Sequence, residues 1–182
     1  MLKATDIANF FIDVSNSMDE EIITNMKVNE LVYFAQAWSL VKFNTKLFNE
    51  NIEAWEHGPV IPSVYQAFRP CGSKNIEMTI GEYDESIFTS EQLNFLADIA
   101  LTYGKYTAAA LRNISHKPGS PWAQVYEKKK NNIITPESMK KYFSALSELP
   151  DYKAATQKII GYRDAEGYLV LPKDWNDENV IS

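Results

Sequence analysis

Hydrophobic residues recur at helical spacing along most of the chain. A first amphipathic helix is expected behind Thr5 as its N-cap. Its apolar positions are Ile7, Phe10, Phe11 and Val14. Residues 27–41 differ, because they are apolar nearly all round rather than along one stripe. That pattern is typical of a helix buried at the centre of a domain.

Capping signals predict where later helices begin. Thr89 and Gln92 have the spacing of a capping box. Ser120-Pro121 and Thr135-Pro136 each place an N-cap residue before a proline in the first turn, where a missing N–H costs nothing. A further helix is expected at residues 107–114, and the lysines at 128–130 should close the helix that starts at Ser120.

Signals for β structure are few. Residues 70–84 read as a loop or a short edge strand, and residues 162–171 as a small hairpin turned around Glu166-Gly167. The sequence therefore predicts a mainly α fold, a compact single-domain helical bundle around a buried central helix with at most a small β element. The domain should cover residues 1–182, with the hairpin and a polar tail at 160–182.

The most distinctive motif lies at residues 52–65, where rare residue types occur at fixed offsets. Trp55 supplies a large apolar side chain, Gly58 permits backbone angles that other residues resist, and Pro59 and Pro62 fix φ. The motif predicts a rigid turn leading into a short helix that starts near Pro62.

Three more stretches accompany this motif. Residues 26–38 contain Lys27, Leu31, Tyr33, Ala35 and Gln36 at the spacing of a Lys-Leu-Gln-Lys-Leu-Leu-Tyr-Tyr run followed by Ala-Gln. Later come Tyr103-Gly104 and then Ser115-His116 to Pro121-Trp122. In this order the four stretches resemble the Panacea antitoxin domain, a SocA-like, phage-associated family whose members pair with many unrelated toxins. Glu30 stands where the family usually has a second Lys, and Ser115 replaces the usual Thr.

The resemblance implies a protein-binding module that uses no cofactor. Its partner would be a cognate protein toxin encoded by an adjacent gene, which the domain blocks by direct binding or hands to a protease as an adaptor. The partner-binding face should include exposed side chains that flank the motifs, namely Lys27, Glu30, Tyr33 and Glu56. The other motif residues should be mainly structural: Gln36, Trp38, Trp55, His57, Gly58, Pro59, Tyr65, His116 and Trp122.

Composition narrows the classes of partner. A net charge of −6 argues against a surface built to hold nucleic acid and favours a basic protein partner. No apolar run approaches the ~20 residues needed to span a bilayer, and the N-terminus lacks a signal-peptide pattern. The single cysteine, Cys71, cannot form an internal disulfide. These features predict a cytoplasmic protein.

An alternative interpretation gives chemistry to the two histidines. His57 and His116 both fall inside the motifs, so a hydrolase or a nucleic-acid-binding regulator that uses them, or the basic residues 128–130, stays open. However, the two histidines and Cys71 lack the close spacing of zinc ligands, and there is no Gly-x-Ser-x-Gly elbow. We therefore expect no catalytic residue and no metal site, and hydrogen bonds from both histidines to nearby turns.

Overall fold

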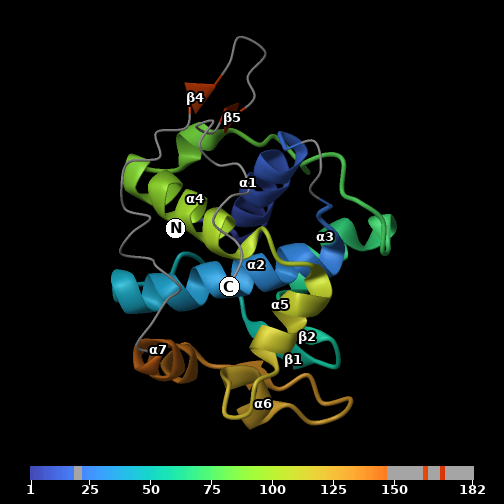
Figure 1. The fold of residues 1–182 in the computed structure, drawn as a ribbon, viewed down its shortest axis with the longest axis vertical. Coiled ribbons are helices and arrows are strands. Elements are labelled where there is room, and N and C mark those ends of the chain that lie inside the picture. The colour runs from blue at the N-terminus through green and yellow to red at the C-terminus, as the bar shows by residue number, and fades with distance from the viewer. Residues whose placement is uncertain (19–21, 147–161, 164–168, 171–182) are drawn as a thin grey trace, which may run out of the picture.

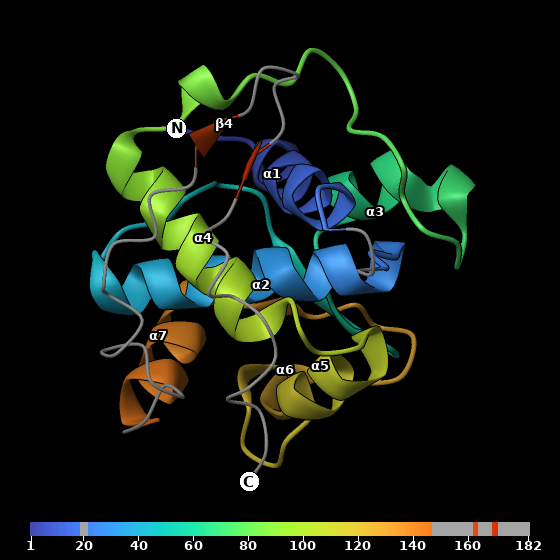
Figure 2. The same cartoon turned by 45° about the horizontal axis from the view of Figure 1, so that its top comes forward.

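The computed structural model describes residues 1–18, 22–146, 162–163 and 169–170. One long helix, α2 (Asn25–Lys42), crosses the middle of the molecule, as Figure 1 shows in light blue. On one side it contacts α1 (Ala4–Asn16) and α4 (Ser90–Tyr103), and on the other α5 (Ala108–Ser115) and α7 (Pro136–Ala145). The turned view in Figure 2 keeps α2 between these two groups. The mainly α bundle around a central helix is confirmed.

The burial of α2 comes from aromatic packing on several of its faces. The Phe34 ring stacks on Tyr103 of α4 with centroids 4.2 Å apart, and Phe143 of α7 meets the same ring edge-on. Trp38 contacts Phe143 as well and donates its indole N–H to the Tyr103 hydroxyl at 2.8 Å. Because neighbours cover every side, the near-continuous apolar pattern of this segment has a direct structural cause.

The motif at residues 52–65 contains a β-hairpin that the sequence did not predict. Strand β1 (Ile52–Trp55) pairs antiparallel with β2 (Gly58–Val60) and, on its other edge, with β3 (Ile133–Ile134). The expected turn is present, but it connects two strands rather than standing alone. Helix α3 (Pro62–Phe68) follows, and Pro62 lies in its first turn as predicted.

The loop alternative for residues 70–84 is confirmed, since this stretch is described throughout and none of its residues lies in a strand. Short 3₁₀ turns lie beside it, η1 (Arg69–Cys71) and η2 (Glu85–Ile87). The loop is held to the core by Ile76, which is 1% exposed and donates its N–H to the Ile23 carbonyl at 2.9 Å.

Most predicted helix starts are confirmed, and two details are wrong. The Thr89–Gln92 capping box opens α4, and the Ser120 and Thr135 hydroxyls cap α6 (Pro121–Val125) and α7. However, α1 begins before Thr5, because the Asp6 carboxylate accepts the Lys3 N–H at 2.8 Å and so caps the first turn. Helix α6 ends at Val125, so residues 128–130 lie in an exposed turn beyond it.

Near the C-terminus, β4 (Tyr162–Arg163) pairs antiparallel with β5 (Leu169–Val170). The strand pairing predicted for the small hairpin is therefore confirmed. Its turn at Glu166-Gly167 and the polar tail lie outside the described residues. A single domain over residues 1–182 stays a prediction.

Candidate functional site

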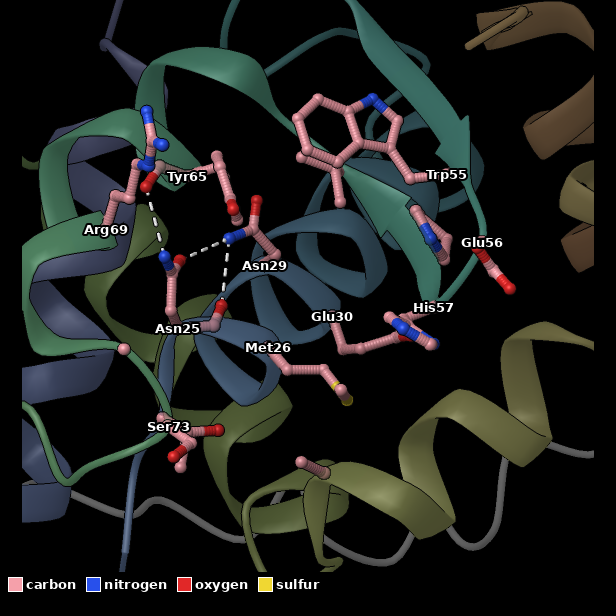
Figure 3. Close-up of a pocket in the computed structure, with 15 residues that line it drawn as sticks. Asn25, Met26, Asn29, Glu30, Trp55, Glu56, His57, Tyr65, Arg69 and Ser73 are labelled. Atoms are coloured by element: carbon pink, nitrogen blue, oxygen red, sulfur yellow. Dashed lines mark hydrogen bonds between the residues drawn. The ribbon is translucent and has the colours of Figure 1, made fainter. Parts of the chain in front are cut away.

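A pocket of about 510 Å³ lies where the first turns of α2 meet the β1–β2 hairpin and α3. Figure 3 shows the side chains that line it. Six of them were singled out from the sequence: Glu30, Trp55, Glu56, His57, Pro59 and Tyr65. Nine were not: Thr24, Asn25, Met26, Asn29, Val60, Arg69, Gly72, Ser73 and Ala108. The volume lies within the range of small-molecule and side-chain binding pockets.

Two asparagines on α2 position the walls of the pocket. Asn25 donates its side-chain amide to the Tyr65 carbonyl at 3.0 Å, which ties α3 to α2. Asn29 donates its side-chain amide to the backbone carbonyl and to the side-chain oxygen of Asn25. The Oδ1 atom of Asn29 accepts the Ile61 N–H at 2.9 Å. Two polar residues four apart in a nearly all-apolar helix are a signal that could have revealed this site, because they share one face.

Glu30 is the most unusual group in the pocket wall. Its side chain is 1% exposed, and Oε2 is buried without a hydrogen-bond partner. The other oxygen, Oε1, lies 3.0 Å from the Ser115 hydroxyl, which also lies 3.0 Å from the Arg112 carbonyl. A hydroxyl carries one hydrogen, so both contacts are satisfied together when Glu30 is protonated and donates to Ser115.

Burial explains the protonation of Glu30. Removal of the carboxylate from water disfavours its charged form and raises its pKa from 4.5 to about 8, although the Ser115 hydrogen bond and the Arg112 charge act in the opposite direction. The hairpin covers it closely, because a Cβ added at Gly58 would overlap Oε1 of Glu30. Gly58 has φ of +131°, a conformation that side chains other than glycine rarely adopt. The glycine thus permits both the turn and this contact.

Aromatic side chains form another wall of the pocket and fix the hairpin to the rest of the molecule. The Trp55 and Tyr65 rings are tilted against each other with centroids 4.8 Å apart. Trp55 donates its indole N–H to Glu53 Oε2 at 2.7 Å, and its carbonyl accepts the Trp122 indole N–H at 2.8 Å. Trp55 is only half-buried, so this motif residue, expected to be mainly structural, also forms part of the pocket wall.

The two histidines lie in different surroundings. His57 is exposed in the hairpin turn and lines the pocket. His116 does not make the hydrogen bond that was expected at the helix end, because its Nε2 is buried without a partner. Its ring instead stacks on Trp122 with centroids 3.5 Å apart. Desolvation, with the charges of Arg112 and His57, lowers the pKa of His116 to about 4. In the described ranges, no three His, Cys, Asp or Glu residues are grouped as metal ligands.

Three of the four side chains expected on an exposed partner face are not exposed. Lys27 is 5% exposed, Glu30 1% and Tyr33 0%. The expectation of exposure was wrong because α2 is covered on all sides, including the face that carries its polar residues. Glu56 is exposed at the hairpin turn as expected. Lys27 and Tyr33 do not line the pocket, whereas Glu30 and Glu56 do.

The remaining motif residues have contacts that fit structural roles. Gln36 is buried and joins α2 to the following loop, donating to the Phe48 carbonyl at 2.9 Å and accepting the Leu47 N–H at 2.8 Å. Trp38 and Trp122 are buried beside hydrogen-bond partners described above. The pocket does not include these three side chains.

Comparisons with known proteins match a region that includes most of the pocket wall. The profile described as "Antitoxin SocA-like, Panacea domain" matches residues 28–123, which is more than half of the chain. The chain is 31% identical over 133 residues to Antitoxin SocA of Caulobacter vibrioides (strain NA1000 / CB15N), and the alignment covers 65% of this chain and 68% of that protein. No solved structure matches the chain significantly. Of the helices within the described residues, none has the length and apolarity to cross a membrane.

Proposed function

The chain belongs to the SocA-like Panacea antitoxin family, and we propose that it neutralises a cognate protein toxin by binding it directly. The observation that carries the proposal is the profile match over residues 28–123, which runs from α2 to α6 and includes most of the pocket wall. The resemblance seen in the sequence motifs is confirmed by this match. The identity of the toxin, its encoding by an adjacent gene and a phage association are parts of the proposal.

Binding without chemistry fits the groups in the pocket better than catalysis does. The buried carboxyl in the wall, Glu30, has a pKa raised to about 8 and packs under the hairpin. Asn25 and Asn29 are engaged in hydrogen bonds that hold α3 and the Ile61 N–H at its start. We therefore treat these residues as a shaped binding surface.

Direct blocking can be separated from delivery to a protease. The chain and the product of its neighbouring gene are expressed together in a bacterial host, once with its ATP-dependent proteases intact and once without them. Direct blocking predicts that growth is rescued in both hosts. An adaptor predicts rescue only where the protease is present and faster loss of the partner protein there. Failure of rescue in both hosts would contradict the antitoxin proposal.

The hydrolase or regulator alternative is tested by removing imidazole chemistry. A His57→Gln/His116→Gln double variant retains side chains that can form hydrogen bonds. We expect this variant to neutralise the toxin as the wild type does, provided that circular dichroism shows an intact fold. Loss of neutralisation with an intact fold would favour the hydrolase or regulator alternative over the antitoxin proposal.

We also propose that the protein acts in the cytoplasm. Its single cysteine, Cys71, is a free thiol that lies half-buried after α3, which is compatible with a reducing compartment. Fractionation of the native host, with the chain detected by antibody, tests this placement.

A further inference from the structure

We propose that the end of the pocket lined by Glu30 and Glu56 receives an arginine side chain of the toxin, with the Glu30 carboxylate as its counter-ion. This inference rests on the proposed function and names the chemistry by which the toxin would be recognised. It starts from an unsatisfied atom, because Glu30 Oε2 is buried without a hydrogen-bond partner in the wall of a pocket of about 510 Å³. Buried polar atoms of folded proteins are nearly always paired, so this one calls for a donor.

Glu30 lines the pocket, so a side chain seated there would lie beside its carboxyl. Figure 3 shows the Glu30 side chain extending from α2 along the pocket toward His57, with the exposed Glu56 beside them in the hairpin turn. Oε1 meets the Ser115 hydroxyl of α5 and packs against Gly58, whereas Oε2 has no hydrogen-bond partner. The remaining oxygen is therefore the part of the group that an incoming side chain can use.

The charges around this end of the pocket favour a cation. Glu30 and Glu56 are both carboxylic residues in the wall, and the chain as a whole carries a net charge of −6. Arg112 of α5 acts on Glu30 from outside the pocket wall, and the one basic residue in the wall, Arg69, is exposed and lies at the opposite end of the pocket in Figure 3. Because Arg69 is exposed and distant from this end, solvent and salt screen its charge more strongly than they screen the carboxylates beside the ligand.

The shape and chemistry of the pocket favour arginine among cations. The Trp55 and Tyr65 rings and the Met26 side chain supply apolar and aromatic surface next to the carboxylates. A guanidinium stacks on aromatic faces, presents a fork of N–H donors to a carboxylate and stays charged at all relevant pH values. Lysine has the charge but lacks the planar fork, so it should bind more weakly.

Such binding would have a proton signature. In the free protein the pKa of Glu30 is about 8, so the group is mainly neutral at pH 7. A guanidinium beside it favours the carboxylate, so binding releases a proton. The charge that acts on Glu30 is that of Arg112 from α5, and Glu30 in turn helps burial to raise the pKa of Tyr33 on the next turn of α2 well above 10, so Tyr33 stays neutral between pH 6 and 8. His57 faces the same space from the hairpin, so its contribution is removed with His57→Gln.

The first test uses the wild-type protein and a small probe, so it does not require the toxin. N-acetyl-arginine amide is titrated into the protein at pH 8, and ¹H–¹⁵N spectra are recorded. N-acetyl-citrulline amide, which has nearly the same shape without the charge, is the matched control. We expect the arginine probe to saturate a shift of the Trp55 indole signal that the citrulline probe does not produce. Equal responses to both probes would overturn the proposal.

The second test uses the toxin candidate, the protein encoded by the neighbouring gene. Glu30→Gln keeps the shape of the side chain and should weaken this complex about tenfold or more, whereas Glu91→Gln on the exposed start of α4 should leave it unchanged. For the wild type and for His57→Gln, the affinity should rise by up to about tenfold per pH unit between pH 6 and 8 and then level off. Calorimetry in two buffers of different ionisation enthalpy should count close to one proton released.

The two tests separate this proposal from the proposed function. A saturating arginine response without toxin neutralisation would leave the cation site and remove the antitoxin role. Neutralisation and affinity unchanged in Glu30→Gln, without proton release, would leave the antitoxin role and overturn the arginine site.

Discussion

Glu30 links the burial of one carboxyl to the pH dependence of the whole fold. Its pKa is about 8 in the folded protein against 4.5 for an ordinary glutamate, so between these values the unfolded state holds fewer protons than the folded state. The stability that the neutral carboxyl gives is complete below pH 4.5 and is lost as pH rises through 8, at up to about 1.4 kcal/mol per pH unit.

Glu30→Gln should remove this dependence, because the amide never ionises. Urea unfolding between pH 5 and 8.5 should give a wild-type free energy of unfolding that falls with pH relative to the variant. Parallel curves for the two proteins would show that the carboxyl does not titrate in this window. Charge reversal with Glu30→Lys should damage the fold, since it buries an ammonium beside Arg112.

Gly58 meets two requirements at once, a positive φ and the absence of a Cβ against Glu30. Gly58→Ala should therefore lower the melting temperature more than Gly119→Ala does. Gly119 has φ of +80°, but a Cβ there meets no atom within 4 Å, so the control carries the backbone cost alone. Equal losses at the two positions would mean that the contact with Glu30 costs nothing.

Among the elements, the β1–β2 hairpin depends on α6 through the indole of Trp122. Trp122→Phe leaves the Trp55 carbonyl without its donor and should cost roughly 1–3 kcal/mol. Hydrogen exchange of residues 52–60 should become faster in this variant. Trp55→Phe is the matched control, because it loses the bond from its own indole to Glu53 within β1 and keeps the bond from Trp122, so it should cost less. Unchanged exchange in Trp122→Phe would argue that the hairpin is held by its own pairing.

The sequence allowed prediction of those elements whose signals are local. Thr89 with Gln92, and the Ser120-Pro121 and Thr135-Pro136 pairs, mark helix starts because a cap acts within one turn. Strands β1 and β3 were missed because each is short and gains its hydrogen bonds from a partner far along the chain, with Ile52 opposite Ile134. Such pairing leaves no periodic pattern in two or four residues.

At the scale of the whole molecule, the central helix could be predicted but the site only in part. An apolar pattern nearly all round α2 indicated burial, yet the polar side chains of Lys27, Glu30 and Tyr33 were expected at the surface. Their burial depends on how α2 packs against its neighbours, including α5 and the hairpin, which a helix pattern by itself does not contain. The hairpin motif did indicate the site, since Trp55, Glu56 and His57 all line the pocket.

The central claim is that this chain neutralises a toxin by binding it. Two purified proteins are enough to test this claim. The chain is titrated with the product of its neighbouring gene by isothermal calorimetry, with no protease present, and the mixture is passed over a sizing column. The account predicts saturable binding at a fixed stoichiometry, co-elution of the two proteins and loss of the partner's toxic activity at the same ratio. Separate elution with no heat of binding, while the partner stays active, would contradict it.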